Sequence, residues 1–221
     1  MKSLETLKAK EPTNPHTYFD ISRCEEASLQ YGLEDEMFIH SINERRLYLY
    51  DEICSESVGS IITDIMLINR MDRGIPASER KPIILYISSV GGSVPDGFGL
   101  IDVIENSTTP VYTVNMAYQY STAFFIGIAG KKRFAFKSST FLMHDGSSFV
   151  SDSTSKCRDV LDFQIVTEDV VKKYVLAHTK ISEELYNNKY RIEWYTYAKQ
   201  AKEYGFTDYI IGEDCDFEEI V

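Results

Sequence analysis

Three groups of residues in this sequence suit acyl-transfer chemistry. A glycine pair, Gly91-Gly92, follows an apolar run at residues 83–88. Ser121 comes a few residues after a second such run at residues 111–116, and His144 ends the segment TFLMH. Sites in α/β sheets form at the carboxyl ends of strands, so an α/β fold would bring these groups to one edge of its sheet.

Together these groups match the needs of a serine nucleophile. A serine at a helix N-terminus lies where the helix dipole favours negative charge, and a nearby histidine can accept its proton as a general base. Backbone N–H groups of a glycine turn can bind an oxyanion, because glycine has no side chain to block a close approach. We therefore interpret the glycine turn as the group that binds the tetrahedral oxyanion formed when Ser121 attacks an acyl carbon.

Each group also has an ordinary structural interpretation when it is taken alone. Most glycine pairs are only turns, a serine before a helix is usually an N-cap, and a histidine at a strand end is usually a polar terminus. Ser121 lies in QYSTA and not in the G-x-S-x-G pattern of a nucleophile elbow. The other histidines are interpreted as non-catalytic, and they are His16, His40 and His178.

The elements that must position these groups follow from the pattern of apolar residues. Strands are predicted at residues 45–53, 83–88 and 111–116, in RFAF and TFLMH, and in FTDYII near the C-terminus. Helices are predicted at residues 57–73, 96–105, 121–130, 151–179 and 197–205. This alternation predicts an α/β fold with a largely parallel sheet and right-handed crossovers.

The helix predicted at residues 151–179 is long for a compact domain. Its apolar residues recur at helical spacing, and they include Val160, Leu161, Ile165, Val166, Val170, Val171, Val175 and Leu176. Periodicity alone leaves two interpretations open. The helix either faces the core of its own domain, or it projects and buries its apolar stripe against a partner chain.

Composition limits the classes of function. The chain has 221 residues, 43% of them hydrophobic, which is enough for one sizeable core. Its net charge of −11 repels phosphate backbones, so nucleic-acid binding is not expected. Its four cysteines have no zinc-site spacing and are interpreted as free thiols of a reducing compartment. Because we find neither a secretory signal nor an apolar run of membrane-spanning length, we expect a cytoplasmic protein with no membrane partner.

Four blocks of the sequence resemble the proteolytic subunit of the Clp protease, in the same order and spacing. They are YISSVGGSVPDGFGLID, VYTVNMAYQYSTAFFIGIAG, KRFAFKSSTFLMHD and LAHTKISEELYNNKYRIEWYTYAKQAKEYGFTD, within roughly residues 45–211. The resemblance implies an α/β Clp protease/crotonase-like fold of repeated β-β-α units with a projecting long handle helix. The implied organisation is a partly irregular N-terminal segment at residues 1–44, a head domain at residues 45–150 and 180–221, and the handle helix at residues 151–179 for inter-ring contact.

The resemblance also assigns roles at the matched positions. Ser121 matches the nucleophile, His144 the general base and Glu193 the triad acid. Gly92 and Thr122 match the two residues whose backbone N–H groups form the oxyanion hole. No metal and no organic cofactor is implied.

The chain departs from the family pattern at several positions near these residues. The triad acid is Glu193 instead of aspartate, and Tyr120 stands where the family has alanine. Asp145 follows the histidine where glutamine is typical, which makes it a candidate substitute acid, although a polar turn residue is the commoner role. Asn106 occupies an aromatic position of the family's docking pocket for its ATPase partner.

The resemblance implies a self-compartmentalised serine endopeptidase that hydrolyses peptide bonds of unfolded proteins. Its implied partners are protein and peptide substrates, copies of itself in stacked seven-membered rings, and an AAA+ unfoldase, which would use the ATP. Two alternatives stay open. One is a catalytically inactive structural or regulatory ring subunit, favoured by the changed acid and the bulky Tyr120. The other is a crotonase-type enzyme whose oxyanion hole binds acyl-CoA thioesters.

Overall fold

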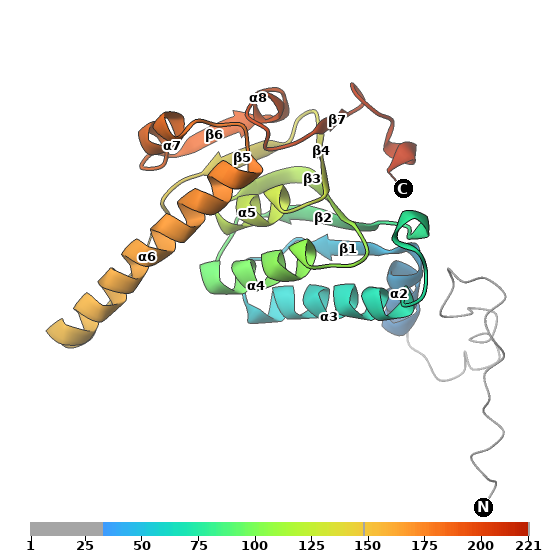
Figure 1. The fold of residues 1–221 in the computed structure, drawn as a ribbon, viewed down its shortest axis with the longest axis horizontal. Coiled ribbons are helices and arrows are strands. Elements are labelled where there is room, and N and C mark those ends of the chain that lie inside the picture. Colours follow the sequence, from blue (N-terminus) through green and yellow to red (C-terminus); the bar gives the residue numbers. More distant parts are fainter. Residues whose placement is uncertain (1–32, 148, 221) are drawn as a thin grey trace, which may run out of the picture.

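The computed structural model describes residues 33–147 and 149–220 of the chain (Figure 1). Its elements are, in order, α2 (Leu33–Glu44), β1 (Arg46–Leu49), α3 (Ser55–Met71), η2 (Ala77–Glu79), β2 (Ile83–Ser89), α4 (Val94–Glu105), β3 (Val111–Tyr120), α5 (Thr122–Ile128), β4 (Lys132–Phe136), β5 (Thr140–Met143), α6 (Thr154–His178), α7 (Glu183–Lys189), β6 (Trp194–Tyr197), α8 (Ala198–Glu203), β7 (Tyr209–Ile211) and η3 (Phe217–Glu219). Most of the N-terminal segment expected to be irregular, residues 1–32, lies outside the described residues. The remainder of that segment forms α2.

A seven-stranded sheet carries the fold, with its main strands in the order β1-β2-β3-β4-β7. These neighbours all pair in parallel, which confirms the α/β fold with a largely parallel sheet. β2 is almost wholly apolar because both of its faces are covered. Ile83, Leu85 and Ile87 are buried in the main core, and Ile84 and Tyr86 are buried in a smaller cluster.

Helices α3, α4 and α5 cover one face of the sheet (Figure 1). α3 buries Val58, Ile61, Ile65 and Ile68, which recur every three or four residues and therefore lie on one side of the helix. α5 is buried along its whole length. The glycine pair before α4 and Ser121 before α5 are thus held at the carboxyl ends of β2 and β3.

β3 is longer than the sequence predicted, and it pairs with two strands along its length. Residues 112–115 pair with β4, and residues 118–120 pair in parallel with β5. β5 in turn pairs antiparallel with β6. The prediction ended this strand at Met116, where the apolar run stops. The extension carries the chain up to Ser121 alongside β5.

α6 projects beyond the rest of the molecule (Figure 1). Val171 and Val175, in its C-terminal half, are buried in the main core. The rest of the helix exposes large apolar side chains, which are Val160, Leu161, Phe163, Ile165, Val166 and Val170. Of the two interpretations that periodicity left open, the structure shows the projecting helix. Among the described helices, none is long and apolar enough to span a membrane.

Candidate active site

The glycine pair after β2 forms a turn that depends on the absence of side chains. Gly91 and Gly92 have positive φ angles of 98° and 147°. A Cβ atom on Gly91 would lie 2.6 Å from the carbonyl oxygen of Tyr120 and 2.8 Å from Cβ of Ser121. The turn therefore lies directly against the end of β3, and this close approach requires glycine.

Hydrogen bonds fix the direction of the N–H group of Gly92. The N–H of Ile53 donates to the carbonyl of Gly91 at 2.8 Å. In a trans peptide the C=O and N–H groups point in opposite directions, so the N–H of Gly92 points away from Ile53. The hydroxyl of Thr122 donates to the carbonyl of Gly92 at 2.8 Å. The structure thus joins the two residues that the resemblance assigned to an oxyanion hole.

Ser121 has a strained backbone between β3 and α5. Its φ of 54° and ψ of −125° cost about 1–3 kcal/mol for a residue with a side chain. Among the other non-glycine residues that the structure describes, only Arg45 has a positive φ. Ser121 is the N-cap of α5, but its side chain makes no capping hydrogen bond. Its N–H donates to the carbonyl of Leu142 at 3.0 Å, which holds the serine beside β5.

His144 and Glu193 come together because β5 and β6 are antiparallel neighbours. Met143 pairs with Trp194, so the next residues outward are His144 and Glu193. Nδ1 of His144 lies 2.8 Å from Oε1 of Glu193. An ionised carboxylate only accepts hydrogen bonds, so Nδ1 carries the proton. In the neutral ring, the lone pair of Nε2 is then available to accept a hydrogen bond or a proton.

The parallel pairing of β3 with β5 places this pair next to the serine. Tyr120 pairs with Leu142, so Ser121 and His144 follow the carboxyl ends of adjacent strands. Nε2 of His144 is buried and has no hydrogen-bond partner among the described residues. The structure therefore brings the three residues to one edge of the sheet without a hydrogen bond between Ser121 and His144.

The remaining candidates stay apart from this group. Asp145 makes no hydrogen bond to the ring of His144 in the described part of the chain, because Glu193 occupies Nδ1. His40 and His178 each pair with a carboxylate on another part of the molecule. His16 lies outside the described residues. No group of three or more potential metal ligands (His, Cys, Asp or Glu) occurs within the described ranges.

The bulky Tyr120 is held by side chains of β5 and β6. Its hydroxyl shares a hydrogen bond with Oγ1 of Thr140 at 2.8 Å. Its ring packs edge-on against Tyr195, with the ring centroids 5.6 Å apart. Desolvation and the nearby carboxylate of Glu193 raise the pKa of Tyr195, which keeps its hydroxyl neutral. Sequence reasoning missed Tyr195, whose only signal is its place in the aromatic run WYTY.

Ser89 is a second residue that sequence reasoning missed. It is 1% exposed, and its hydroxyl donates to the carbonyl of Asp51 at 2.6 Å. The same hydroxyl accepts from the N–H of Gly91 at 3.2 Å. Ser89 therefore fixes the start of the glycine turn, and its signal in the sequence is a polar residue that closes an apolar strand.

Comparisons with known proteins agree with this architecture. The family model for Clp protease matches residues 30–214. The ATP-dependent Clp protease proteolytic subunit 2 of Corynebacterium diphtheriae is 28% identical over 195 residues, which cover 87% of this chain and 94% of that protein. The ATP-dependent Clp protease proteolytic subunit 1 of Frankia casuarinae is 25% identical over 183 residues, which cover 81% of this chain and 83% of that protein.

A solved structure shows the same fold. A ClpP1 mutant from Listeria monocytogenes aligns with a TM-score of 0.69 at 20% identity, over 81% of this chain and 96% of that one. The branched parallel sheet with its projecting helix is thus the fold of Clp proteolytic subunits. Because the family model matches most of its length, the chain belongs to the Clp protease family. The resemblance seen in the sequence is confirmed, together with the fold that it implied.

Proposed function

We propose that this protein is a serine endopeptidase subunit that hydrolyses peptide bonds of unfolded proteins. The observation that carries the proposal is the His144–Glu193 pair, with 2.8 Å between Nδ1 and Oε1, at the strand end next to Ser121. In serine hydrolases a carboxylate fixes the tautomer of the histidine that serves the serine, and glutamate fills this role in some of them.

In the proposed reaction, Oγ of Ser121 attacks the carbonyl carbon of the peptide bond while Nε2 of His144 accepts its proton. Glu193 stabilises the imidazolium, and the N–H groups of Gly92 and Thr122 bind the oxyanion. His144 then gives the proton to the leaving amine, and an acyl ester remains on Ser121. Water, deprotonated by His144, hydrolyses this ester and restores the serine hydroxyl.

The reaction requires Ser121 and His144 to form a hydrogen bond that this arrangement lacks. Nε2 of His144 has no partner, and the side chain of Ser121 makes no capping bond, so neither atom has to break a hydrogen bond within the described chain first. Catalytic hydrogen bonds are often long without substrate and tighten when it binds. We therefore propose that the side chain of Ser121 rotates toward His144 when substrate binds.

We further propose that the protein works as stacked seven-membered rings of itself, with α6 as the contact between rings. Phe163 and Ile165 on this projecting helix are 67% and 62% exposed. Burial against another copy would remove this apolar surface from water. The relatives' names contain the word ATP-dependent, which supports an AAA+ unfoldase as the partner that supplies substrate.

The surface expected to bind such an unfoldase differs in this chain from the family pattern. Asn106, at the expected aromatic position, is the C-cap of α4, and its side-chain amide donates to the carbonyl of Asp102 at 2.8 Å. This side chain is engaged with its own helix and offers no apolar contact. We therefore expect a partner whose docking segment is more polar than the family's usual one.

A catalytically inactive ring subunit is the second candidate, and two observations favour it. Ser121 and His144 form no hydrogen bond with each other in the described chain. The side chain of Glu193 is 59% exposed, and water weakens the interaction of an exposed carboxylate with an imidazolium.

Labelling with a fluorophosphonate serine probe tests the proposed function. We expect the wild-type protein to be labelled and the Ser121→Ala variant to remain unlabelled, both in a ring-sized particle on a sizing column. A ring-sized particle without labelling would support the inactive subunit. Equal labelling of both proteins would show that the reactive serine lies elsewhere.

A further inference from the structure

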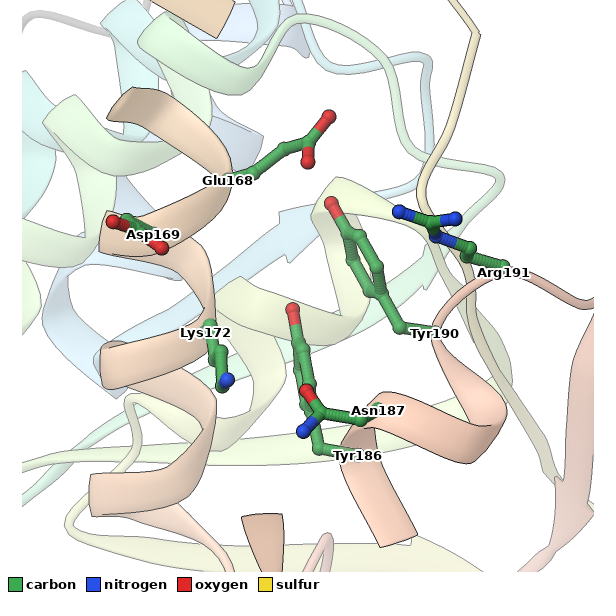
Figure 2. Close-up of a pocket in the computed structure, with 7 residues that line it drawn as sticks. All are labelled: Glu168, Asp169, Lys172, Tyr186, Asn187, Tyr190 and Arg191. Carbon is green, nitrogen blue, oxygen red and sulfur yellow. The ribbon is translucent and has the colours of Figure 1, made fainter. Parts of the chain in front are cut away.

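A pocket of about 370 Å³ lies between α6 and α7 (Figure 2). Both helices and the loop after α7 line it, and the residues that matter here are Glu168, Lys172, Tyr186, Asn187, Tyr190 and Arg191. The two tyrosine side chains lie side by side, with their hydroxyl groups directed into the pocket (Figure 2). Polar groups from both helices therefore line the pocket.

The pocket lies beside the His144–Glu193 pair. Arg191 precedes Glu193 by two residues in the loop that leads into β6. The carboxylate of Asp145, the residue after His144, is close enough to influence the pKa of the tyrosines at the pocket. A peptide held for cleavage at this site would thus have room to place one side chain between α6 and α7.

Tyr186 presents a buried hydroxyl without a partner. Tyr186 is 2% exposed, and its hydroxyl forms no hydrogen bond within the described residues. Its ring stacks on that of Tyr190, with the centroids 4.9 Å apart. A buried polar group that lacks a hydrogen bond is costly. The hydroxyl of Tyr190 is the neighbour that acts on that of Tyr186. A ligand that supplied a well-formed hydrogen bond would remove the cost.

Two carboxylates act on the hydroxyl groups of Tyr186 and Tyr190. Glu168 reaches toward them from α6 (Figure 2), and Asp145 acts on the same tyrosines. Lys172 is paired with Glu183 at 2.7 Å, so its charge is already compensated within the protein. Arg191 and Glu168 are both exposed, so water and salt screen both of their charges.

Both tyrosines stay neutral at physiological pH. Burial raises the pKa of Tyr190 to about 12, with further contributions from Glu168 and Asp145. Burial likewise raises the pKa of Tyr186. The hydroxyl groups can therefore accept a hydrogen bond from a cation without adding a charge of their own.

We propose that this pocket binds the cationic side chain of a lysine or arginine in the peptide substrate and so selects the position of cleavage. This inference rests on the proposed endopeptidase function. The aliphatic stem of the side chain would lie along the stacked tyrosine rings. Its charged end would donate hydrogen bonds to the carboxylate of Glu168 and to the hydroxyl oxygen of Tyr186.

Peptide cleavage provides the first test. The substrates are identical except for lysine, norleucine or glutamate before the cleaved bond. We expect kcat/KM for lysine to exceed that for norleucine by about tenfold or more, because one charge-assisted contact is worth that much. Glu168→Gln should remove about tenfold of this ratio and Tyr186→Phe about threefold. The matched control Glu184→Gln changes an exposed glutamate of α7 outside the pocket and should leave the ratio as it is.

Binding to the Ser121→Ala variant provides a second test that needs no catalysis. Fluorescence anisotropy with the same peptides should show tighter binding of the lysine peptide, and adding Glu168→Gln should reduce the difference by about tenfold. Equal or tighter binding of norleucine would overturn the inference. Tighter binding of glutamate would overturn it as well, since Arg191 would then dominate the pocket.

The two proposals fail in distinguishable ways. If the serine probe does not label the protein but the lysine peptide still binds more tightly, only the endopeptidase proposal is contradicted. Labelling of Ser121 together with a preference for norleucine would leave the endopeptidase standing and remove the pocket's assignment.

Discussion

Glu193 reaches the ring of His144 across the end of the β5–β6 pair, with 2.8 Å between Oε1 and Nδ1. Glu193→Gln keeps the shape of the side chain but removes the charge that would stabilise the imidazolium, so we expect kcat to fall by about 10²–10⁴-fold. Glu193→Asp withdraws the carboxylate by about 1 Å, for which we expect a loss of about 10²-fold. Steady-state cleavage of a fluorogenic peptide measures both. Glu203→Gln, an exposed residue of α8, is the control, and an unchanged kcat in Glu193→Gln would contradict the assigned role.

Gly91 is the residue where the smallest change should have the largest effect. An added Cβ would lie 2.6 Å from a backbone oxygen, at a φ of 98°. We expect Gly91→Ala to displace the turn, lower the Tm and abolish labelling by the serine probe. Gly99 lies within α4, where an added Cβ meets no atom within 4 Å. Gly99→Ala should keep the labelling and stabilise the fold by up to about 1 kcal/mol. If both variants kept the labelling and the Tm, the close approach of Gly91 to β3 would not be required for activity.

Part of the site could be predicted residue by residue. The glycine pair, Ser121 and His144 each follow an apolar run, so their position at strand ends was visible in the sequence. Glu193 could be assigned only by resemblance, because it lies 49 residues from His144 along the chain. The missing Ser121–His144 hydrogen bond and the pocket at Tyr186 depend on distances of a few ångströms between separate elements. No local pattern encodes such distances.

The strands and helices that were predicted correctly are those in which a periodic run of apolar residues is long enough to define the element. β6 was missed because it has only four residues, of which Trp194 and Thr196 are buried and the other two exposed. Its partner β5 lies far back in the sequence, so the pairing is set by tertiary packing. α7 was missed for the same reason, since it has seven residues and buries only Tyr186.

The joint between α2, β1 and α3 depends on a buried ion pair. Arg45 donates to Asp72 at 2.7 Å, with side chains that are 5% and 1% exposed, and the hydroxyl of Thr109 also donates to Asp72. Asp72→Asn leaves the guanidinium without its counter-charge, so we expect the free energy of unfolding to fall by about 3–5 kcal/mol in urea titrations. Asp102→Asn on α4 is the matched control. A loss below about 1 kcal/mol would show that water reaches the guanidinium.

The same ion pair gives the fold an acid dependence. Burial alone would raise the pKa of Asp72, but the hydrogen bonds from Arg45 and Thr109 outweigh it and hold the pKa below its ordinary value of 3.8. A carboxyl group with a lowered pKa stabilises the folded state above its ordinary pKa, and this contribution is lost as the pH falls below it. We expect the wild-type free energy of unfolding to decline below about pH 4, and Asp72→Asn to show a shallower decline. Parallel curves would contradict this assignment.

One half of α6 belongs to the core, and the other half projects from the molecule (Figure 1). Its C-terminal half is part of the core, whereas Ile165 in the projecting part is 62% exposed. We expect Ile165→Glu to leave the Tm of the head unchanged and to reduce the particle mass from stacked rings to a single ring, as measured by mass photometry. Gln200→Glu, at an exposed residue of α8, controls for the one added negative charge. Unchanged stacking in Ile165→Glu would place the ring contact elsewhere.

The double pairing of β3 gives the sheet two arms, and both arms contribute side chains to one hydrophobic core. β3 keeps β4 at one end and β5 at the other, so Ser121 and the glycine turn belong to the main sheet while His144 and Glu193 belong to the β5–β6 arm. We expect the β5–β6 arm to open more readily than β2, which would separate His144 and Glu193 from Ser121 in a single event. Amide hydrogens of β5 and β6 should then exchange with solvent together, and faster than those of β2. The proposed activity would then follow the free energy of this local opening, so mild denaturant should reduce it before the fold melts.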